Sequence, residues 1–164
     1  MAESLRQRPE VQVLWQCGRL YAREMEQSAT AALPNVRLLP YVERMDLAYA
    51  LADLVVARAG AITISELSLA GKAALLVPSP NVAEDHQTRN AEALVRNGAA
   101  VLLPDAAAER ELGPRALQLL DEPESLERLQ KNIRALARPD AAQRIAEQVL
   151  RLAHNAAAHA PGSH

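Results

Sequence analysis

Short apolar runs alternate with longer amphipathic stretches along most of this chain. Runs of four or five mainly apolar residues have the length of buried parallel strands. They predict strands at residues 11–15, 36–39, 53–57, 73–77 and 99–103. The stretches between them predict helices at residues 19–31, 43–51, 62–70 and 85–97. This alternation is typical of an α/β fold, a Rossmann-like parallel sheet with helices on both faces.

The C-terminal third has a different pattern, with helical periodicity and no further strand. Residues 105–153 predict three helices. Three prolines punctuate this segment, and each is expected at a helix start or just before one; they are Pro114, Pro123 and Pro139. We therefore expect one domain over residues 11–153, preceded by an N-terminal arm or short helix (1–10) and followed by a disordered tail (154–164).

The composition agrees with one globular domain and narrows the range of partners. Apolar residues make up 49% of the 164 residues, which is enough for a sizeable core. Aromatic residues contribute only 2%, so aliphatic side chains must form that core. The formal net charge of −2 provides no field that favours nucleic acid, and we expect no nucleic-acid partner.

Cysteine content and hydropathy predict a cytoplasmic location. Cys17 is the single cysteine, so an internal disulfide is excluded and a reducing compartment is expected. No apolar run reaches the length of a membrane-spanning helix, and the first ten residues lack the apolar core of a signal peptide. Any membrane contact should therefore be peripheral.

Two predicted loops lie where a ligand would bind. Residues 58–61 follow the strand at 53–57, and residues 78–86 follow the strand at 73–77. In open α/β sheets, ligands occupy the crevice at the carboxyl ends of the strands. We expect these loops to form two walls of a ligand site.

The first loop carries two candidates for phosphate binding. Gly60 would let a phosphate approach the backbone beside the unpaired N–H groups of the following helix. The alternative is a simple tight turn, which a single glycine indicates more readily than a phosphate site. Arg58 could pair with a phosphate or brace a neighbouring carboxylate.

Polar residues on the two helices that follow these loops suit a sugar ligand. Thr63 and Glu66 share one helix face, where the carboxylate could accept hydrogen bonds from both ribose hydroxyls. The alternative is that Glu66 simply stabilises the helix terminus. His86, Gln87 and Asn90 could bind sugar hydroxyls and amides, or else form a polar first turn with Asp85 as its cap. The sequence has no metal-ligand pattern such as HExxH, and we predict no metal.

The ordered series of motifs resembles the MurG family. These are the undecaprenyl-diphospho-muramoylpentapeptide β-N-acetylglucosaminyltransferases of peptidoglycan synthesis, and the similarity spans about residues 11–153. The segments that carry it are WQCGR (15–19), RAGAITISE (58–66), AG (70–71), LVP (76–78), DHQTRNA (85–91) and GAA (98–100). Cys17 departs from the more usual Thr of the family, and His86 departs from the Gln that some members carry.

The resemblance implies the C-terminal half of a GT-B glycosyltransferase that binds UDP-GlcNAc as its donor, without a cofactor or metal. It implies that the backbone of Val42 recognises uracil and that Glu66 holds the ribose. It also implies that the start of the helix after the turn at residues 58–60 lies near the diphosphate and sugar. That helix start comprises Ala61, Ile62 and Thr63. His86 and Gln87 would read the GlcNAc hydroxyls, and Asn90 would support their loop.

The resemblance also implies parts that this chain does not contain. Family members have an N-terminal domain that binds lipid I, and it is expected to supply the catalytic base, so the catalytic residues are unknown here. The first strand and glycine-rich loop of the C-terminal domain also have no counterpart. In a sheet of order 3-2-1-4-5-6 that strand is central, so we predict either a gap or a closed-up sheet between the strands at 11–15 and 53–57.

Three functions follow as alternatives. The chain is the donor half of an inverting GlcNAc transferase that is inactive alone and lies on the inner face of the plasma membrane when joined to its N-terminal half. Alternatively, it is a stand-alone binding subunit that needs a separate membrane or acceptor subunit. The third alternative is an inactive fragment, although Glu66 and the His86–Gln87 pair are retained.

Overall fold

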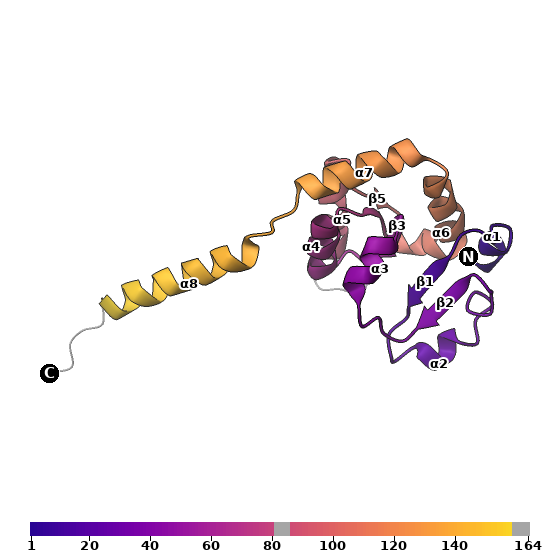
Figure 1. Cartoon of the computed structure of the whole chain (residues 1–164), viewed down its shortest axis with the longest axis horizontal. Coiled ribbons are helices and arrows are strands. Elements are labelled where there is room, and N and C mark those ends of the chain that lie inside the picture. The colour runs from indigo at the N-terminus through magenta and orange to yellow at the C-terminus, as the bar shows by residue number, and fades with distance from the viewer. Residues whose placement is uncertain (81–85, 159–164) are drawn as a thin grey trace.

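The computed structural model describes residues 1–80 and 86–158 of the chain (Figure 1). Its strands are β1 (Val13–Gln16), β2 (Val36–Leu39), β3 (Leu54–Ala57), β4 (Ala73–Leu76) and β5 (Val101–Leu102). Its helices are α1 (Ala2–Arg6), α2 (Ala22–Met25), α3 (Met45–Leu51), α4 (Ala61–Ala70), α5 (His86–Arg96), α6 (Asp105–Leu120), α7 (Pro123–Ala135) and α8 (Ala141–Ala158). The predicted alternation of strands and helices is confirmed.

The strands form two separate parallel sheets, with the orders β1-β2 and β3-β4-β5. Of the two predicted outcomes, a gap or a closed-up sheet, the structure has the gap, because β1 and β3 do not pair with each other. Each has only one partner among the described strands. Leu14 on β1 is 48% exposed and Val56 on β3 is 40% exposed, which is unusual for apolar residues of a parallel sheet.

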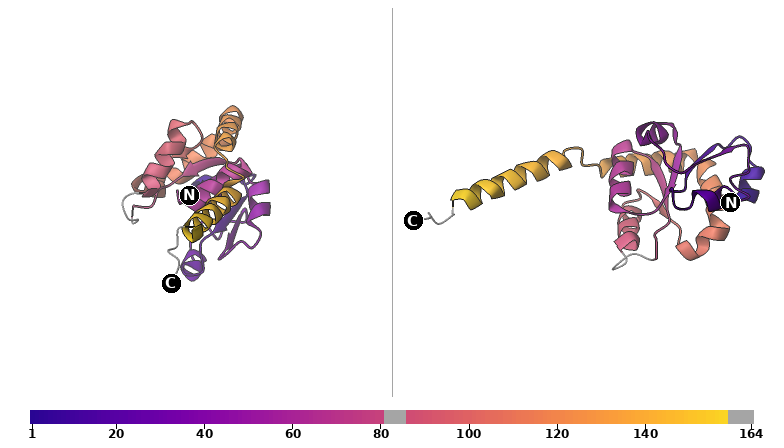
Figure 2. Two further views of the ribbon diagram at one scale, coloured as in Figure 1. Left: turned by 90° about the vertical axis from the view of Figure 1, so that its left-hand side faces the viewer. Right: turned by 90° about the horizontal axis from the view of Figure 1, so that it is seen from below.

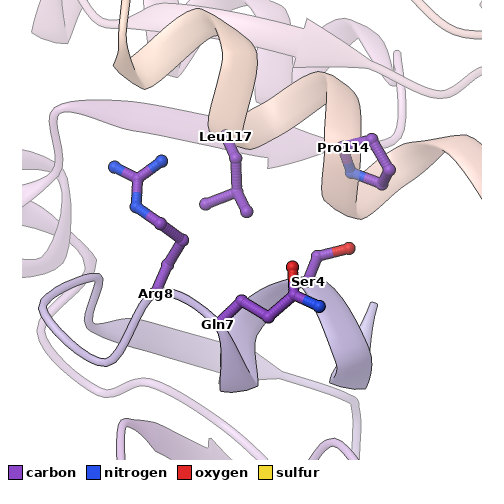
Figure 3. Close-up of a pocket in the computed structure, with 5 residues that line it drawn as sticks. All are labelled: Ser4, Gln7, Arg8, Pro114 and Leu117. Carbon is purple, nitrogen blue, oxygen red and sulfur yellow. The ribbon is translucent and has the colours of Figure 1, made fainter.

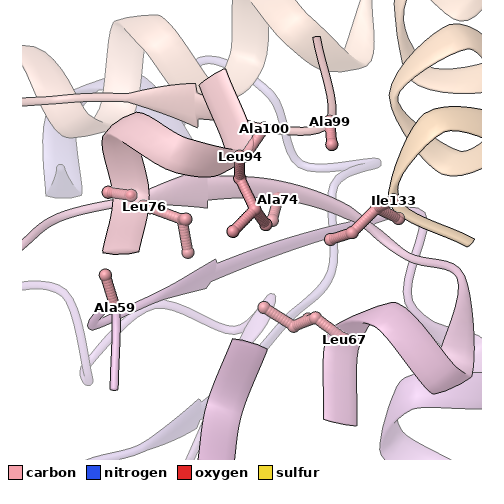
Figure 4. Close-up of a cluster of buried hydrophobic side chains, with 9 residues drawn as sticks. Ala59, Leu67, Ala74, Leu76, Leu94, Ala99, Ala100 and Ile133 are labelled. Atoms are coloured by element: carbon pink, nitrogen blue, oxygen red, sulfur yellow. The ribbon is translucent and has the colours of Figure 1, made fainter. Parts of the chain in front are cut away.

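The strand β4 is the centre of the core, since all four of its residues are buried. Its side chains alternate between two apolar clusters, as the period of a strand requires. Ala74 and Leu76 join one cluster with Leu67 of α4 and Ile133 of α7 (Figure 4). The other two residues of β4 join a second cluster together with residues of α6 and α7. Helices thus cover both faces of this sheet, as predicted.

Two predictions within the helical segments are wrong. The helix expected at residues 19–31 is reduced to α2, because the Ser28 hydroxyl accepts a bond from the Ala31 N–H at 3.2 Å and favours a turn. Pro114 lies inside α6 rather than at its start. Apolar residues on both sides of Pro114 pack on the core and keep α6 continuous. Pro123 begins α7 and Pro139 shortly precedes α8, as expected.

The two ends of the chain behave differently. The N-terminal segment folds as the short helix α1 against α6, and Leu5 is only 3% exposed. The helix α8 extends away from the body of the molecule (Figures 1 and 2). It continues to Ala158, beyond the expected start of the tail at residue 154, because its sequence is rich in alanine, the strongest helix former. Residues 159–164 lie outside the described residues.

No helix in residues 1–80 and 86–158 is both long enough and apolar enough to cross a bilayer.

Candidate functional site

The two predicted loops leave the same edge of the three-stranded sheet. In the parallel register of β3 and β4, Ala57 lies opposite Leu76, so both strands end together. The loops at residues 58–60 and 77–80 therefore start side by side at the carboxyl edge. Both loops begin at the carboxyl edge, as predicted, although residues 81–85 of the second loop lie outside the described residues. Their role as walls of a ligand site stays a prediction.

The Gln87 side chain ties the two loops together. Its Oε1 accepts a hydrogen bond from the Ala59 N–H at 3.2 Å and another from the Ser79 N–H at 2.9 Å. Ala59 belongs to the first loop and Ser79 to the second, so one amide oxygen holds both. Its Nε2 atom has no hydrogen-bond partner among the described residues. Gln87 can therefore offer a ligand a donor but no acceptor.

Asn90 completes this clamp from the next turn of α5. Its Nδ2 donates to the carbonyl oxygen of Ala59 at 3.1 Å. Residues three apart on a helix share a face, so Gln87 and Asn90 bind the N–H and the C=O of the same residue. Ala59 is fully buried in the core cluster. The observed bond supports the loop at residues 58–60, whereas the resemblance implied support for the loop of His86 and Gln87, which stays a prediction.

Arg58 braces the carboxyl edge of the sheet. Its Nη1 donates to the carbonyl oxygens of Val77 and Pro78, both at 3.2 Å, and also to the Asp105 carboxylate at the start of α6. Of the two roles considered for Arg58, this geometry supports the brace to a carboxylate. A phosphate contact by Arg58 has no support in these bonds.

The N-terminus of α4 faces this edge without a capping side chain. Gly60 is its N-cap residue with φ −68°, which any residue can adopt, and an added Cβ would meet only the Thr63 Oγ1 at 3.8 Å. The backbone conformation therefore does not explain the glycine. Ile62, on the first turn, is 76% exposed. The first N–H groups of α4, on Ala61, Ile62 and Thr63, offer the positive end of a helix dipole.

Glu66 lies one turn further along α4 and is held by a residue that the sequence analysis missed. The Tyr49 hydroxyl of α3 donates to the Oε2 of Glu66 at 2.9 Å. Burial, followed by this bond to a carboxylate, raises the pKa of Tyr49 to about 12, so the hydroxyl keeps its proton at neutral pH. A signal was present in the sequence, because Tyr49 is the only aromatic residue of its helix.

Val42 is placed by a second residue that the analysis missed. Its backbone N–H donates to the Oε1 of Gln16, at the end of β1, at 2.8 Å. Val42 itself is only 8% exposed. The Gln16 side chain thus fixes the segment between β2 and α3 to the first sheet. Its position in the WQCGR motif was the available signal.

The contacts of the described residues do not show a role for the remaining candidates. His86 is exposed at the start of α5. Asp85, expected as the cap of this helix, lies outside the described residues. No group of three or more His, Cys, Asp or Glu that could hold a metal occurs in residues 1–80 and 86–158. The absence of a metal requirement stays a prediction.

A cavity of about 360 Å³ lies elsewhere, between α1 and α6 (Figure 3). Ser4, Gln7 and Arg8 line it on one side, and Pro114 and Leu117 line it on the other. None of these residues belongs to the loops at the carboxyl edge. The cavity is therefore separate from the candidate site.

The chain matches the model of the glycosyltransferase family 28 C-terminal domain over residues 1–145. It is 47% identical over 151 residues to the UDP-N-acetylglucosamine--N-acetylmuramyl-(pentapeptide) pyrophosphoryl-undecaprenol N-acetylglucosamine transferase of Bacteroides fragilis. That alignment covers 91% of this chain and 40% of the relative. The protein of the same name from Porphyromonas gingivalis is 49% identical over 144 residues, which cover 87% of this chain and 38% of the relative.

A solved structure is similar to this chain as well. The crystal structure of Acinetobacter baumannii MurG superposes with a TM-score of 0.78 at 32% identity, and the match covers 92% of this chain and 44% of that one. The chain thus spans about two fifths of the length of the curated relatives that it matches.

Proposed function

Because the chain belongs to glycosyltransferase family 28, whose C-terminal domain it matches over residues 1–145, we propose that it is the donor-binding half of a MurG-type transferase. Such an enzyme moves GlcNAc from UDP-GlcNAc to undecaprenyl-diphospho-muramoylpentapeptide, converting lipid I to lipid II. The observation that carries the proposal is the carboxyl edge of the sheet, where Gln87 and Asn90 hold two loops beside the uncapped start of α4.

The diphosphate would bind at the N-terminus of α4. The first N–H groups of this helix have no side-chain cap, and the helix dipole favours negative charge there. Gly60 would leave room for the phosphate oxygens at the turn. These amides would stabilise the charge that develops on the leaving UDP, so the protein itself supplies the electrostatic stabilisation.

The nucleoside and the sugar would lie on either side of the diphosphate. The backbone of Val42 would contact uracil through its carbonyl, since Gln16 already occupies its N–H. The Glu66 carboxylate would accept bonds from the ribose hydroxyls. The Nε2 of Gln87 would donate to a GlcNAc oxygen, with His86 beside it at the start of α5.

The reaction would be an inverting displacement. The acceptor hydroxyl attacks the anomeric carbon of GlcNAc, and the bond to the diphosphate breaks with its electron pair leaving on UDP. The acceptor and the base that removes the hydroxyl proton would come from the N-terminal half of a complete transferase. We therefore expect no turnover by this chain alone, and a peripheral position on the cytoplasmic membrane face when the halves are joined.

A second candidate is a binding subunit that works with a separate acceptor-binding chain. The observation that favours it is the split sheet, in which β1 and β3 each leave one edge without a described partner. Exposed strand edges in a sheet interior are normally covered. Co-purification with an acceptor-binding chain would distinguish this arrangement from a covalently continuous enzyme.

Calorimetric titration with UDP-GlcNAc tests the proposal directly. The purified chain should bind this donor, and Glu66→Ala should weaken binding about tenfold, because a hydrogen bond to a charged group contributes about 1.5 kcal/mol or more. Glu109→Ala, an exposed acidic residue in α6, is a matched control that should bind normally. A folded chain without affinity for UDP-GlcNAc would contradict the proposal.

A further inference from the structure

The residue Tyr49 has no role in the proposed donor site, yet it contacts one of that site's central groups. Its hydroxyl lies 2.9 Å from the Oε2 of Glu66 and donates to it. The two residues come from different helices, α3 and α4, 17 positions apart in the sequence. A bond of this kind fixes a side chain that is otherwise exposed to solvent.

The tyrosine is a rigid support for this bond. Its ring is partly buried and packs against the core cluster that contains Leu67 and Ile133. The end of α3 is fixed as well, because the Lys72 Nζ donates to the carbonyl oxygens of Ala50 and Ala52 at 3.1 and 3.0 Å. Both α3 and the Tyr49 ring are therefore already fixed before a ligand binds, so binding does not have to order them.

The geometry leaves the carboxylate able to accept further bonds. A carboxylate has about four lone-pair sites, of which Tyr49 occupies one. The neutral hydroxyl adds no competing charge, and it selects one orientation of a side chain that otherwise loses considerable rotamer freedom on binding. Oε1 and the remaining lone pair of Oε2 stay available for two neighbouring hydroxyl groups.

We propose that Tyr49 is a positioning residue that holds the Glu66 carboxylate ready for the ribose hydroxyls of the nucleotide. The inference rests on the proposed function, because it takes Glu66 as the ribose ligand. It also links the two parts of the nucleoside site. The segment that carries Val42 leads directly into α3, so the Tyr49 bond sets the distance between the uracil-contacting backbone and the ribose carboxylate.

The test uses Tyr49→Phe, which keeps the ring packing and removes only the donor. The probes are UDP and 2′,3′-dideoxy-UDP, which lacks the hydroxyls that Glu66 would accept. Tyr49→Phe should weaken UDP binding about fivefold, because the Glu66 side chain would then lose its rotamer freedom only when UDP binds. It should leave dideoxy-UDP binding unchanged. Tyr21→Phe, at a tyrosine that is 55% exposed, is the matched control for both probes.

Glu66→Ala separates this inference from the proposed function. In the Glu66→Ala background, Tyr49→Phe should cause no further loss of UDP affinity. Equal weakening of UDP and dideoxy-UDP by Tyr49→Phe, or no weakening of either, would overturn the positioning role while UDP binding still supports the donor site. If the unaltered chain fails to bind UDP, or Glu66→Ala binds it normally, the proposed function fails first and this inference fails with it.

Discussion

The Gln87 side chain has two separate tasks: its amide oxygen holds two loops, and its amide nitrogen is the proposed sugar contact. Substitutions can remove one task and keep the other. Its Oε1 accepts from two backbone N–H groups, while its Nε2 is the atom available to the sugar. Gln87→Glu keeps an acceptor for both loops and removes the donor. Gln87→Met has a similar length but removes both functions. The two variants should therefore differ in stability and agree in sugar binding.

The stability difference follows from the two bonds. A typical intramolecular hydrogen bond contributes about 1 kcal/mol net, so Gln87→Met should lower the free energy of unfolding by about 2 kcal/mol. That is roughly a thirtyfold change in the ratio of folded to unfolded chain. Gln87→Glu should stay within about 0.5 kcal/mol of the unaltered chain, because its carboxylate accepts the same two bonds.

Urea unfolding and calorimetric titration measure the two effects on the same samples. The added charge of Gln87→Glu repels the diphosphate of any nucleotide, so sugar recognition is read from the ratio of UDP-GlcNAc to UDP affinity. This ratio should fall about tenfold in both variants, since the lost donor leaves a sugar oxygen unpaired. An unchanged ratio would refute the donor role of Nε2. Equal stability of Gln87→Met and the unaltered chain would refute the clamp.

Four further predictions concern the stability of the fold. Asn35→Ala should cost about 2 kcal/mol in urea unfolding, because the buried Nδ2 donates to three carbonyl oxygens of the N-terminal segment, and the best of these bonds is 2.8 Å long. Gly71→Ala should cost at least about 1 kcal/mol by the same measurement, because φ at this position is +64° and the added Cβ would also displace the Arg134 side chain. The hydrogen bonds from Arg8 lower the pKa of Asp121, so this pair stabilises the fold above about pH 4. That contribution is lost as the pH falls further, and urea unfolding of Asp121→Asn at decreasing pH should not show this loss. Removal of residues 140–164 should leave the urea midpoint unchanged, because every described side chain of α8 after Ala141 is exposed, and a large decrease would show that α8 packs on the body.

Much of the fold could be predicted because the signals are local. Apolar runs such as residues 73–77 are too short for a buried helix, and the helices between them require parallel pairing. Gly71 ends α4 in the left-handed conformation, which a glycine at that position indicates. The motifs resemble a family with one more strand, and they left two outcomes open between β1 and β3, a gap or a closed-up sheet; the structure decided for the gap. The prediction of a helix at residues 19–31 was wrong. Local bonds, such as the one that the Ser28 hydroxyl accepts, compete with the helix and leave no periodic signal in the sequence.

The sequence by itself determined which residue types stand at the carboxyl edge of the sheet, and the tertiary structure decided what each one does there. Spacing put Gln87 and Asn90 on one helix face, but only the packing of α5 on β4 showed that both bind Ala59. Arg58 was open between two roles until α6 brought Asp105 to it. Tyr49 and Glu66 meet because α3 packs against α4, and contacts between separate elements leave no periodic trace in the sequence.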